Sequence, residues 1–489
     1  MTTASTPVCV IGAGTMGRGI AQVALTAGHL VTLVDPAQEQ LDSATAEVES
    51  RLARKAPEIA DSLSERLTTV TSIDAAPVRP GTLVVEAVLE SLQVKGAVLT
   101  AAYEHYGPDA VLATNTSSLS ITEIATATPA PDRVVGMHFF NPVPVMQLVE
   151  VVTGLQTGPD VADLVAELAV AWGKQVARVR SAPGFIVNRV ARAFYGEPLR
   201  LVEEQVAGPR VLDEVVRTAG GFRMGPFELM DLIGNDVNAA VTRSVWTAFH
   251  HDPRFQPSRV QDELVSAGRY GRKRGHGFFP YGQDVPREAL TPVVPGEAPA
   301  AVELSGSDGQ LSQLLARTDV IVTTGDGEGV LLPDGTLVLV TRGRSARAES
   351  AARAGVPVVL LDRCLTPGTA TGLAVATSHP AALPAVAALL QPAGVALHEV
   401  ADAPGLVLAR TLAMIANEAF ETVLHDVAGR EDVDVAMRLG TNYPVGPFAW
   451  TEQWGPAAVV ELLDELHDTY RDPRYRASRL LREDAAATM

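Results

Sequence analysis

The 489-residue chain has little of what several protein classes require. Its two cysteines, Cys9 and Cys364, do not suggest a disulfide framework or a zinc site, and its ten histidines show no metal-ligand spacing. No apolar run approaches the roughly 20 residues of a membrane span, and the N-terminus has no basic region or cleavage signal. The formal net charge of −18 disfavours nucleic acid. We therefore expect a cytoplasmic protein that needs no metal, membrane or nucleic acid.

The beginning of the chain carries a dinucleotide-binding pattern. A predicted strand at residues 8–11 runs into three glycines and a predicted helix, which is the order of a tight turn, a phosphate contact and a close helix–strand approach. A second strand, residues 30–34, ends at Asp35, near the ~20-residue spacing expected for an acid that binds the ribose 2′-hydroxyl. Such an acid repels a 2′-phosphate, so NAD is favoured over NADP, and the alternative is a structural glycine turn. The candidate cofactor residues here are Gly12, Gly14, Thr15, Met16, Gly17 and Asp35.

A histidine and a glutamate suggest proton transfer. His138 begins the run HFFNP, and Glu150 follows twelve positions later. A histidine held by a carboxylate can take a proton from a hydroxyl, because the carboxylate fixes the ring tautomer and stabilises the imidazolium. The alternative for such a pair is a buried histidine at a strand end.

An ordered series of motifs carries a family resemblance over residues 1 to about 281. The motifs are GAGTMG, EAVLE with Lys95, NTSSL, HFFNPVPVMQLVEVV, PGFIVNR, GPFELMDLIG and GRKRGHGFF. This series resembles the 3-hydroxyacyl-CoA dehydrogenase family, in particular its longer bacterial members that act on 3-hydroxybutyryl-CoA or 3-hydroxyadipyl-CoA. The resemblance implies NAD-dependent oxidation of an (S)-3-hydroxyacyl-CoA to the 3-oxoacyl-CoA, as in β-oxidation.

The resemblance also implies roles for individual residues. His138 would be the general base, Glu150 would orient it, Ser117 would hydrogen-bond the substrate oxygen, and Asn188 would hold the substrate near that oxygen. A base, a donor to the oxygen and a fixed geometry for hydride transfer are what the oxidation of an alcohol needs. Asn188 could instead hydrogen-bond a neighbouring helix.

Other assignments have open alternatives. Ser117 lies in a small polar cluster where Thr116 or Ser118 could cap a helix. Glu90 and Lys95 resemble family residues beside the nicotinamide and its ribose, although Lys95 could equally be a solvated helix charge. Asn115 is a further candidate for cofactor binding.

A basic cluster is the candidate site for the CoA phosphates. Arg51, Arg54 and Lys55 lie on a predicted helix, and a local basic patch on an acidic protein suits phosphate groups. An exposed helix face explains the same spacing. For a second carboxylate on the acyl chain, the candidates are Arg192 and Arg223.

The chain contains an internal repeat. Pro183 and Gly184 recur as Pro404 and Gly405, and the Gly-Pro-Phe at residue 225 recurs at residue 446, both at an offset of 221 residues (404 − 183 and 446 − 225). The repeat predicts two copies of a helical domain, separated by a proline-rich join from Pro286 to Pro299.

The region between the copies resembles a shortened Rossmann-like half. Strands are predicted near residues 320–322, 337–340, 358–361 and 373–376. When residues 134–135 are set against 358–359, His138 falls on Asp362 and Glu150 on Ala374, while Asn188 falls on Ala409 in the helical repeat. The glycines at 325, 327 and 329 alternate and precede a strand, so the dinucleotide pattern is missing too. We expect this half to be chemically silent.

The sequence therefore predicts an α/β Rossmann-type NAD-binding domain, an all-α domain, a degenerate Rossmann-like segment and a second copy of the α domain. The predicted bounds are 1–182, 183–281, a linker at 282–303, 304–403 and 404–489. The two helical copies would form a pseudo-dimer within one chain, and a further homo-oligomer is compatible with this; the alternative is duplication followed by decay.

Two other functions stay open at this point. The substrate could be a free hydroxy acid or sugar acid, or the chain could be a non-catalytic nucleotide-binding protein. Retention of the four candidate catalytic residues in one half argues against the second of these. No hydratase-like segment is present, which disfavours a bifunctional β-oxidation enzyme.

Overall fold

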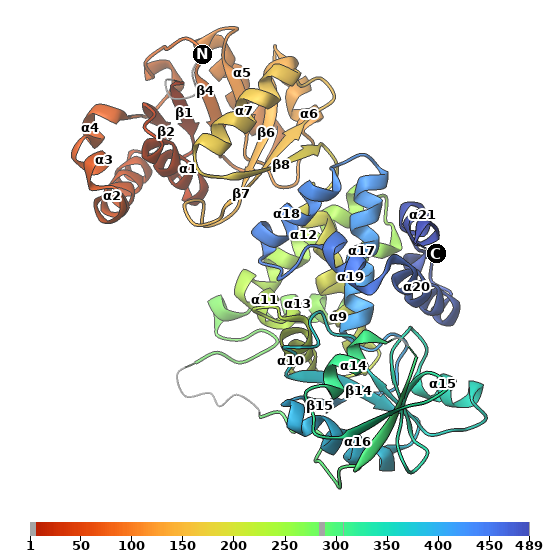
Figure 1. The fold of residues 1–489 in the computed structure, drawn as a ribbon. Helices are drawn as coiled ribbons and strands as arrows, with labels where there is room; N and C mark the ends of the chain where they lie inside the picture. Colours follow the sequence, from red (N-terminus) through yellow and green to blue (C-terminus); the bar gives the residue numbers. More distant parts are fainter. Residues whose placement is uncertain (1–5, 283–288, 307, 489) are drawn as a thin grey trace. The chain divides into compact units, whose positions relative to one another are not determined.

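The computed structural model describes residues 6–282, 289–306 and 308–488, and its chain divides into two compact units (Figure 1). The first contains the chain up to Arg189 together with His425–Thr441, and the second contains Val190–Leu424 and Asn442–Met489. The beginning of the predicted proline-rich join, including Pro286, lies outside the described residues.

The first unit is built on an eight-stranded sheet with the order β3-β2-β1-β4-β5-β6-β7-β8. The strands up to β6 are parallel, β7 runs antiparallel to β6, and β8 is parallel to β7. The order confirms the Rossmann-type domain. The strands are β1 (Val8–Ile11), β2 (Val31–Val34), β3 (Leu67–Val70), β4 (Leu83–Glu86), β5 (Val111–Thr114), β6 (Val134–Phe139), β7 (Leu148–Thr153) and β8 (Gln175–Arg180).

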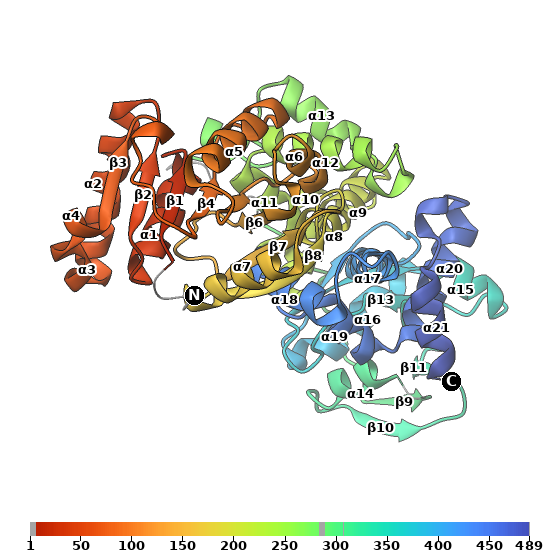
Figure 2. The same cartoon turned by 90° about the horizontal axis from the view of Figure 1, so that it is seen from above.

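Helices cover both faces of this sheet, so its inner strands read as unbroken apolar runs. Helices α1, α2 and α7 form one core with alternate strand residues such as Val10, Leu33 and Val85. Helices α5 and α6 cover the opposite face (Figure 2). The helices are α1 (Thr15–Thr26), α2 (Gln38–Lys55), α3 (Pro57–Asp61), α4 (Leu63–Arg66), α5 (Leu92–Tyr106), α6 (Ile121–Thr126), α7 (Pro159–Ala171) and, at the end of the unit, α8 (Val187–Val190).

A helix from far along the chain completes the first unit. Helix α18 (Arg430–Thr441) packs on β7 and β8. The backbone N–H of Arg180 in β8 donates to the carbonyl oxygen of Val427 at 2.7 Å, and that of Arg178 donates to the Asp432 carboxylate at 3.0 Å. The segment before and within α18 therefore occupies hydrogen-bonding groups at the edge of β8.

The second unit contains a seven-stranded mixed sheet with the order β10-β9-β11-β12-β13-β14-β15. Strand β11 is antiparallel to both its neighbours, and β13 is antiparallel to β14. The sequence predicted β10, β12, β13 and β14 but not the other three, and β9 begins inside the segment expected to be linker. The strands are β9 (Ala301–Ser305), β10 (Ile321–Thr324), β11 (Gly329–Leu331), β12 (Leu337–Val340), β13 (Val358–Leu361), β14 (Gly372–Thr377) and β15 (Ala396–Glu399), and the helices among them are α14 (Gly309–Leu315), α15 (Ala346–Ala352) and α16 (Leu383–Leu390).

The helical copies, most of whose helices belong to the second unit, show the repeat. Helices α10 and α11 recur as α18 and α19 at an offset of 221 residues (430 − 209 and 447 − 226), and α17 spans the counterpart of α8 and α9 together. The first copy continues with α9 (Arg192–Glu203), α10 (Pro209–Gly220), α11 (Pro226–Ile233), α12 (Asn235–Ala248) and α13 (Arg259–Ser266). The second contains α17 (Leu408–Leu424), α18, α19 (Pro447–Trp454), α20 (Pro456–Tyr470) and α21 (Arg479–Ala487).

Among the described residues, no helix is both long enough and apolar enough to span a membrane.

Candidate active site

The turn after β1 has the shape that a dinucleotide requires. Gly12 has a φ of 105°, and a Cβ on Gly17 would overlap the Gly12 carbonyl oxygen, so both positions need glycine. A Cβ on Gly14 would meet no atom within 4 Å, which leaves open space in front of helix α1. No side chain caps this helix, so the N–H groups of its first turn, beginning at Thr15 and Met16, can face a pyrophosphate.

Asp35 follows β2 at the same edge of the sheet. Its carboxylate accepts hydrogen bonds from the backbone N–H of Ala13 at 2.8 Å and of Ala37 at 3.0 Å. Asp35 is half-buried, so the acid both braces the glycine turn and remains accessible beside it. This arrangement fits the ribose hydroxyls of NAD.

His138 and Glu150 form a cross-strand pair. They stand opposite each other on antiparallel β6 and β7, and His138 Nδ1 lies 2.6 Å from Glu150 Oε2. Both side chains are buried. A carboxylate can only accept here, so Nδ1 carries the proton and Nε2 keeps its lone pair. The geometry thus gives the imidazole the tautomer of a general base.

The second oxygen of Glu150 has a structural partner. Oε1 accepts hydrogen bonds from the backbone N–H groups of Ile186 and Val187, both at 3.1 Å. These residues follow Phe185, whose φ of 51° is in the left-handed region, in the PGF turn that leads into α8. Glu150 therefore fixes His138 and the start of the helical segment at the same time.

Ser117 and Asn188 are brought together beside this turn. Asn188 Nδ2 lies 3.5 Å from the Ser117 carbonyl oxygen, so the loop after β5 meets α8. Ser120 caps α6, since its hydroxyl accepts from the Glu123 N–H at 3.3 Å. The alternative that Thr116 or Ser118 caps that helix is wrong, because the helix begins after them.

Glu90 organises the same loop. Its carboxylate accepts from the hydroxyls of Thr116 at 2.6 Å and Ser118 at 2.9 Å, and from the backbone N–H of Ser117 at 3.2 Å. Burial alone would raise the pKa of Glu90, but the hydrogen bonds and the charge of Lys95 hold the pKa below its usual value. The ionised carboxylate of Glu90 thus accepts from the Ser117 backbone and holds that residue in place.

Lys95 is not a solvated helix charge. Only 1% of its surface is exposed, and its ammonium group donates to both oxygens of buried Glu86 at 2.8 and 3.0 Å. It also lies 3.3 Å from the Glu90 carboxylate. Lys95 therefore links the end of β4 to the loop that carries Ser117. Asn115 has a similar role, because its side-chain oxygen accepts from the Phe139 N–H at 2.8 Å, next to His138.

The predicted basic cluster divides in the structure. Arg51 forms an ion pair with Glu47, and the Arg54 guanidinium donates to the Ser50 carbonyl at 3.2 Å. Lys55, at the end of α2, instead lines a cavity. Arg51 and Arg54 thus have partners on their own helix, whereas Lys55 lines the cavity.

That cavity has a volume of about 500 Å³ and lies between α1, the end of α2 and the loop after β6. Its charged lining residues are Lys55 and Lys174, and no carboxylate lines it. Lys174 donates to two carbonyl oxygens of that loop, at 2.6 and 2.8 Å, and burial lowers its pKa. Gln22 is only 4% exposed, and its amide oxygen has no partner among the described residues. A ligand with anionic groups and an N–H donor fits this lining.

The sequence did not single out several residues around the site. The rings of Phe140 and Phe185 lie beside the His138 ring, with centroids 4.5 and 5.7 Å away, and limit its contact with water. Phe140 belongs to the HFFNP motif and Phe185 to PGFIVNR, so the motifs contain both rings but do not indicate that they lie beside His138. Lys174 and Gln22 carried no signal, because a lysine after a turn and a glutamine in a helix are ordinary.

Arg192 and Arg223 both belong to the second unit. Arg192 is buried, and its guanidinium donates to the Thr242 hydroxyl at 3.0 Å. Arg223 is exposed and lines a cavity beside the loop after β13.

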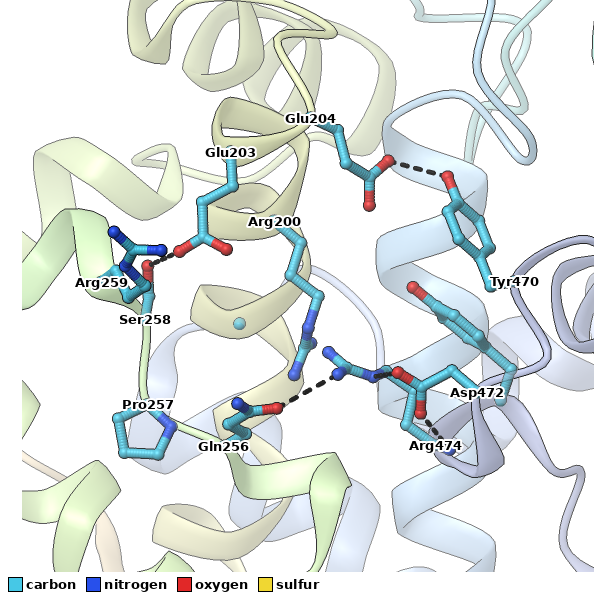
Figure 3. Close-up of a pocket in the computed structure, with 12 residues that line it drawn as sticks. Arg200, Glu203, Glu204, Gln256, Pro257, Ser258, Arg259, Tyr470, Asp472 and Arg474 are labelled. Carbon is cyan, nitrogen blue, oxygen red and sulfur yellow. Dashed lines mark hydrogen bonds and ion pairs between the residues drawn. The ribbon is translucent and has the colours of Figure 1, made fainter.

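A second cavity, of about 240 Å³, lies between the helical copies (Figure 3). Its charged groups are mostly paired within the protein: Glu204 accepts from the Tyr470 hydroxyl at 2.7 Å, and Arg474 donates to Asp472 at 2.7 Å. Such satisfied pairs indicate a structural junction between the copies rather than a substrate site.

In the second sheet, Asp362 follows β13 and its N–H donates to the Ala374 carbonyl of β14 at 2.9 Å, which continues the register of that strand pair. Its buried carboxylate accepts from the backbone N–H groups of Val407, Leu408 and Ala409 at 2.7–3.1 Å. Burial raises the pKa of Asp362 to about 6. The pair has no imidazole.

Comparison with known proteins agrees with this geometry. The model for the 3-hydroxyacyl-CoA dehydrogenase NAD-binding domain matches residues 7–182, and the model for the C-terminal domain of the same family matches residues 184–281 and 405–488. The chain belongs to the 3-hydroxyacyl-CoA dehydrogenase family. Residues 338–404 match the 3-hydroxybutyryl-CoA dehydrogenase reduced Rossmann-fold domain. NAD is therefore the cofactor, as predicted, and the chain is an oxidoreductase.

A curated protein and a solved structure, both from Escherichia coli K12, match nearly the whole chain. The chain is 43% identical to a 3-hydroxyadipyl-CoA dehydrogenase, over 98% of this chain and 97% of the relative. The crystal structure of a 3-hydroxybutyryl-CoA dehydrogenase matches with a TM-score of 0.89 and 41% identity, covering 99% of this chain and 98% of that one. The human mitochondrial hydroxyacyl-coenzyme A dehydrogenase is 39% identical over 56% of this chain and 90% of its own length. That relative aligns with little more than half of this chain.

Proposed function

We propose that the first unit catalyses NAD-dependent oxidation of (S)-3-hydroxyacyl-CoA to 3-oxoacyl-CoA, with His138 as the general base. The observation that carries the proposal is the 2.6 Å contact between His138 Nδ1 and Glu150, which leaves Nε2 as a proton acceptor. NAD supplies the acceptor for the hydride from C3. His138 takes the proton of the 3-hydroxyl, and Glu150 stabilises the imidazolium that results.

The other residues of the site would bind and orient the substrate. The Ser117 hydroxyl would hydrogen-bond the reacting oxygen, and the Asn188 amide would hold it near Nε2. The meeting of the loop after β5 with α8 supports these roles. Phe140 and Phe185 would keep water from competing for the proton of the imidazolium.

For cofactor binding, the backbone at Gly14, Thr15 and Met16 would contact the pyrophosphate, Gly12 and Gly17 would shape the turn, and Asp35 would bind the adenosine ribose. Glu90, Lys95 and Asn115 would act mainly by shaping the loop at the nicotinamide end, since each already has protein partners.

For CoA, the cavity lined by Lys55, Lys174 and Gln22 is the best-supported site. Two cations without a lining carboxylate suit phosphate groups, and the unpaired amide oxygen of Gln22 suits an N–H donor of the ligand. The loop that forms one wall continues directly from the strand of His138. Arg51 and Arg54 would contribute charge at longer range.

The acyl group is either 3-hydroxybutyryl or 3-hydroxyadipyl, the substrates in the names of the E. coli relatives. A free hydroxy or sugar acid is the second candidate substrate class. A non-catalytic role is disfavoured by the intact His138–Glu150 pair. The cytoplasmic location and any further homo-oligomer stay predictions from the sequence.

We further propose that the two helical copies form a pseudo-dimer, with domain bounds as predicted from the sequence. Helix α18 of the second copy packs on the first sheet, and its counterpart α10 of the first copy packs on β14 of the second sheet. This reciprocal packing supports the idea. Sedimentation of a chain ending near Pro280 tests it: we expect self-association or loss of activity, and an active, well-folded monomer would show the idea to be wrong.

The catalytic proposal is tested by NADH consumption with acetoacetyl-CoA and with 3-oxoadipyl-CoA. His138→Ala should lower kcat by about two to four powers of ten, the usual contribution of a general base, while NADH binding persists. The ratio of kcat/KM for the two esters sets the substrate. Equal turnover by His138→Ala and wild type would exclude the proposal, and NADH binding without turnover of either ester would favour the free acid or a silent site.

A further inference from the structure

The catalytic proposal leaves one large cavity of the second unit unused. It has a volume of about 460 Å³ and lies beside the C-terminal end of α10 and the loop between β13 and β14. Its walls come from residues 217–223, 365–371 and 444–445. These segments belong to the first helical copy, the reduced sheet and the second helical copy, so all three contribute to the cavity.

Hydrogen bonds fix the walls. The N–H of Leu365 donates to the Ala219 carbonyl at 3.0 Å, and the N–H of Thr371 donates to the Thr218 carbonyl at 3.3 Å. The Arg317 guanidinium donates to the carbonyl oxygens of Pro367 and Ala370, in the loop between β13 and β14, at 2.6 and 3.1 Å. The carbonyl oxygens of Thr218 and Ala219 near the end of α10 are therefore bonded to the loop, which holds the walls in place.

The charge and polarity of the lining point to an amphipathic anion. The charged lining residues are Arg217 and Arg223, and no carboxylate lines the cavity although the chain carries a net charge of −18. Arg223 is exposed and has no hydrogen bond or ion pair among the described residues, and Arg217 lies 3.7 Å from the Glu214 carboxylate. The buried side chains of Phe222 and Leu365 form an apolar floor.

The position of the cavity has a counterpart in the first half. The loop between β13 and β14 corresponds to the loop after His138, and α10 corresponds to α18 by the 221-residue offset (430 − 209). In the second half this junction of helix and loop holds a cavity.

We propose that this cavity binds a short aliphatic chain that ends in a carboxylate, with Arg217 and Arg223 on the carboxylate and the chain against Phe222 and Leu365. A guanidinium can donate two parallel N–H bonds to one carboxylate. The buried Phe222 and Leu365 side chains can contact the methylene groups of the chain. The ligand is a free acid of this chemistry.

Calorimetric titration of the full-length protein with adipate, hexanoate and hexylamine tests the proposal. The two acids should bind and the amine should not. Arg223→Gln should weaken adipate binding by about tenfold or more, the effect of losing one charge-assisted contact. Arg347→Gln, which removes the same charge from an exposed arginine on α15, should leave it unchanged.

Repeating the titration with NAD⁺ and acetoacetyl-CoA, which together cannot react, shows whether the acid binds apart from the CoA ester. Undiminished adipate binding supports a separate site for a free acid. Adipate that competes with acetoacetyl-CoA binds in the site of the CoA ester, which overturns the proposal. Binding that is absent in the wild type, or equal in Arg217→Gln, Arg223→Gln and the control, overturns the proposal. Because binding is measured directly, a failure of the catalytic proposal would not affect this result.

Discussion

Each of the two sheets has an antiparallel strand pair with a buried acid, but only the first pair sets a histidine opposite that acid. In the first, His138 stands opposite Glu150, and in the second, Asp362 stands opposite Ala374. One oxygen of Glu150 contacts His138 Nδ1, and the other accepts from the backbone N–H groups of Ile186 and Val187. Asp362 gives both oxygens to the turn that begins the second helical copy.

The difference shows that the carboxylate has two separable tasks. In both halves it accepts from the same backbone positions, because residues 407 and 408 are the counterparts of 186 and 187 at an offset of 221 (407 − 186). The acid has moved to the neighbouring strand, yet it still ties the sheet to the following helix. Orienting a general base needs a carboxylate oxygen that is free to accept from an imidazole. In the second half both oxygens of Asp362 accept from backbone N–H groups, and no histidine stands opposite Asp362.

The largest effect on stability is expected where the second copy is tied to the first. Arg410 of α17 is fully buried and donates to Glu197 at 2.9 Å and Glu204 at 2.8 Å, both on or beside α9. Arg410→Ala would remove a buried cation from both carboxylates and leave Glu197 with Arg200 as its one remaining cation among the described residues, which should lower the free energy of unfolding by about 3 kcal/mol. Denaturant unfolding measures this.

Arg471→Ala is the matched control for that variant. Arg471 is 74% exposed and pairs with Asp468 on the surface, so its loss should change the free energy of unfolding by about 1 kcal/mol or less. Equal effects of the two substitutions would show that Arg410 does not hold the copies together.

The next effect concerns the glycine turn that only the first half has. A Cβ on Gly14 meets no protein atom within 4 Å and its backbone φ is −65°, so Gly14→Ala should fold normally. The methyl group would occupy the space of the pyrophosphate, and we expect NADH binding to weaken by about tenfold or more. Fluorescence titration measures the Kd.

Gly208→Ala provides the control, since Gly208 also precedes a helix and has open space around its Cβ position. It should leave both NADH binding and Tm unchanged. If Gly14→Ala binds NADH as the wild type does, Gly14 does not contact the pyrophosphate.

The smallest expected effect is a pH dependence of stability in the first unit. His29 Nδ1 donates to the Thr6 carbonyl at 2.8 Å, and Nε2 accepts from the Trp172 indole N–H at 2.8 Å. Burial lowers the pKa of His29 below 6.5, so the unfolded state takes up the proton first as the pH falls. The stability is therefore fully present above pH 6.5 and is lost as the pH falls below it.

His29→Gln should reduce this loss, because glutamine does not titrate. The check is the difference in unfolding free energy between pH 7.5 and about 5.5, for the variant and the wild type. Burial also lowers the pKa of His398 in the second unit, so a residual slope is expected in the variant. Identical slopes for the two proteins would contradict the role of His29.

Much of the fold could be predicted because its signals are local. The glycine turn, the apolar strands of the first sheet and the helical repeat all follow from short spacings in the sequence. Strands β9, β11 and β15 were not predicted, because β9 and β15 mix polar with apolar residues and β11 has only three residues. The packing of α18 on β7 and β8 was also beyond reach, since amphipathic periodicity shows which face is buried but not against what.

For the site, the residue types could be predicted but not all their partners. The pairing of His138 with Glu150 follows from their motif, whereas the contacts of Glu150 with residues 186 and 187 depend on the tertiary fold. Lys95 was ambiguous because a lysine on a helix is usually solvated. Asp362 directly follows the apolar run Val358–Leu361, so an acid at the end of a strand is visible in the sequence. The alignment with His138 predicts only that the catalytic histidine is missing there, and not that the acid binds the following turn.

The central claim is that the acid is catalytic in the first half and structural in the second. Its most direct test is kcat and Tm for Glu150→Gln and Asp362→Asn, measured in parallel with a 3-oxoacyl-CoA and NADH. Glu150→Gln turns an amide N–H toward His138 Nδ1 and should lower kcat by about a hundredfold or more with little change in Tm. Asp362→Asn should lower the free energy of unfolding by about 1–3 kcal/mol and leave the kcat of the folded protein unchanged. Loss of turnover in folded Asp362→Asn, or full turnover in Glu150→Gln, would contradict the account.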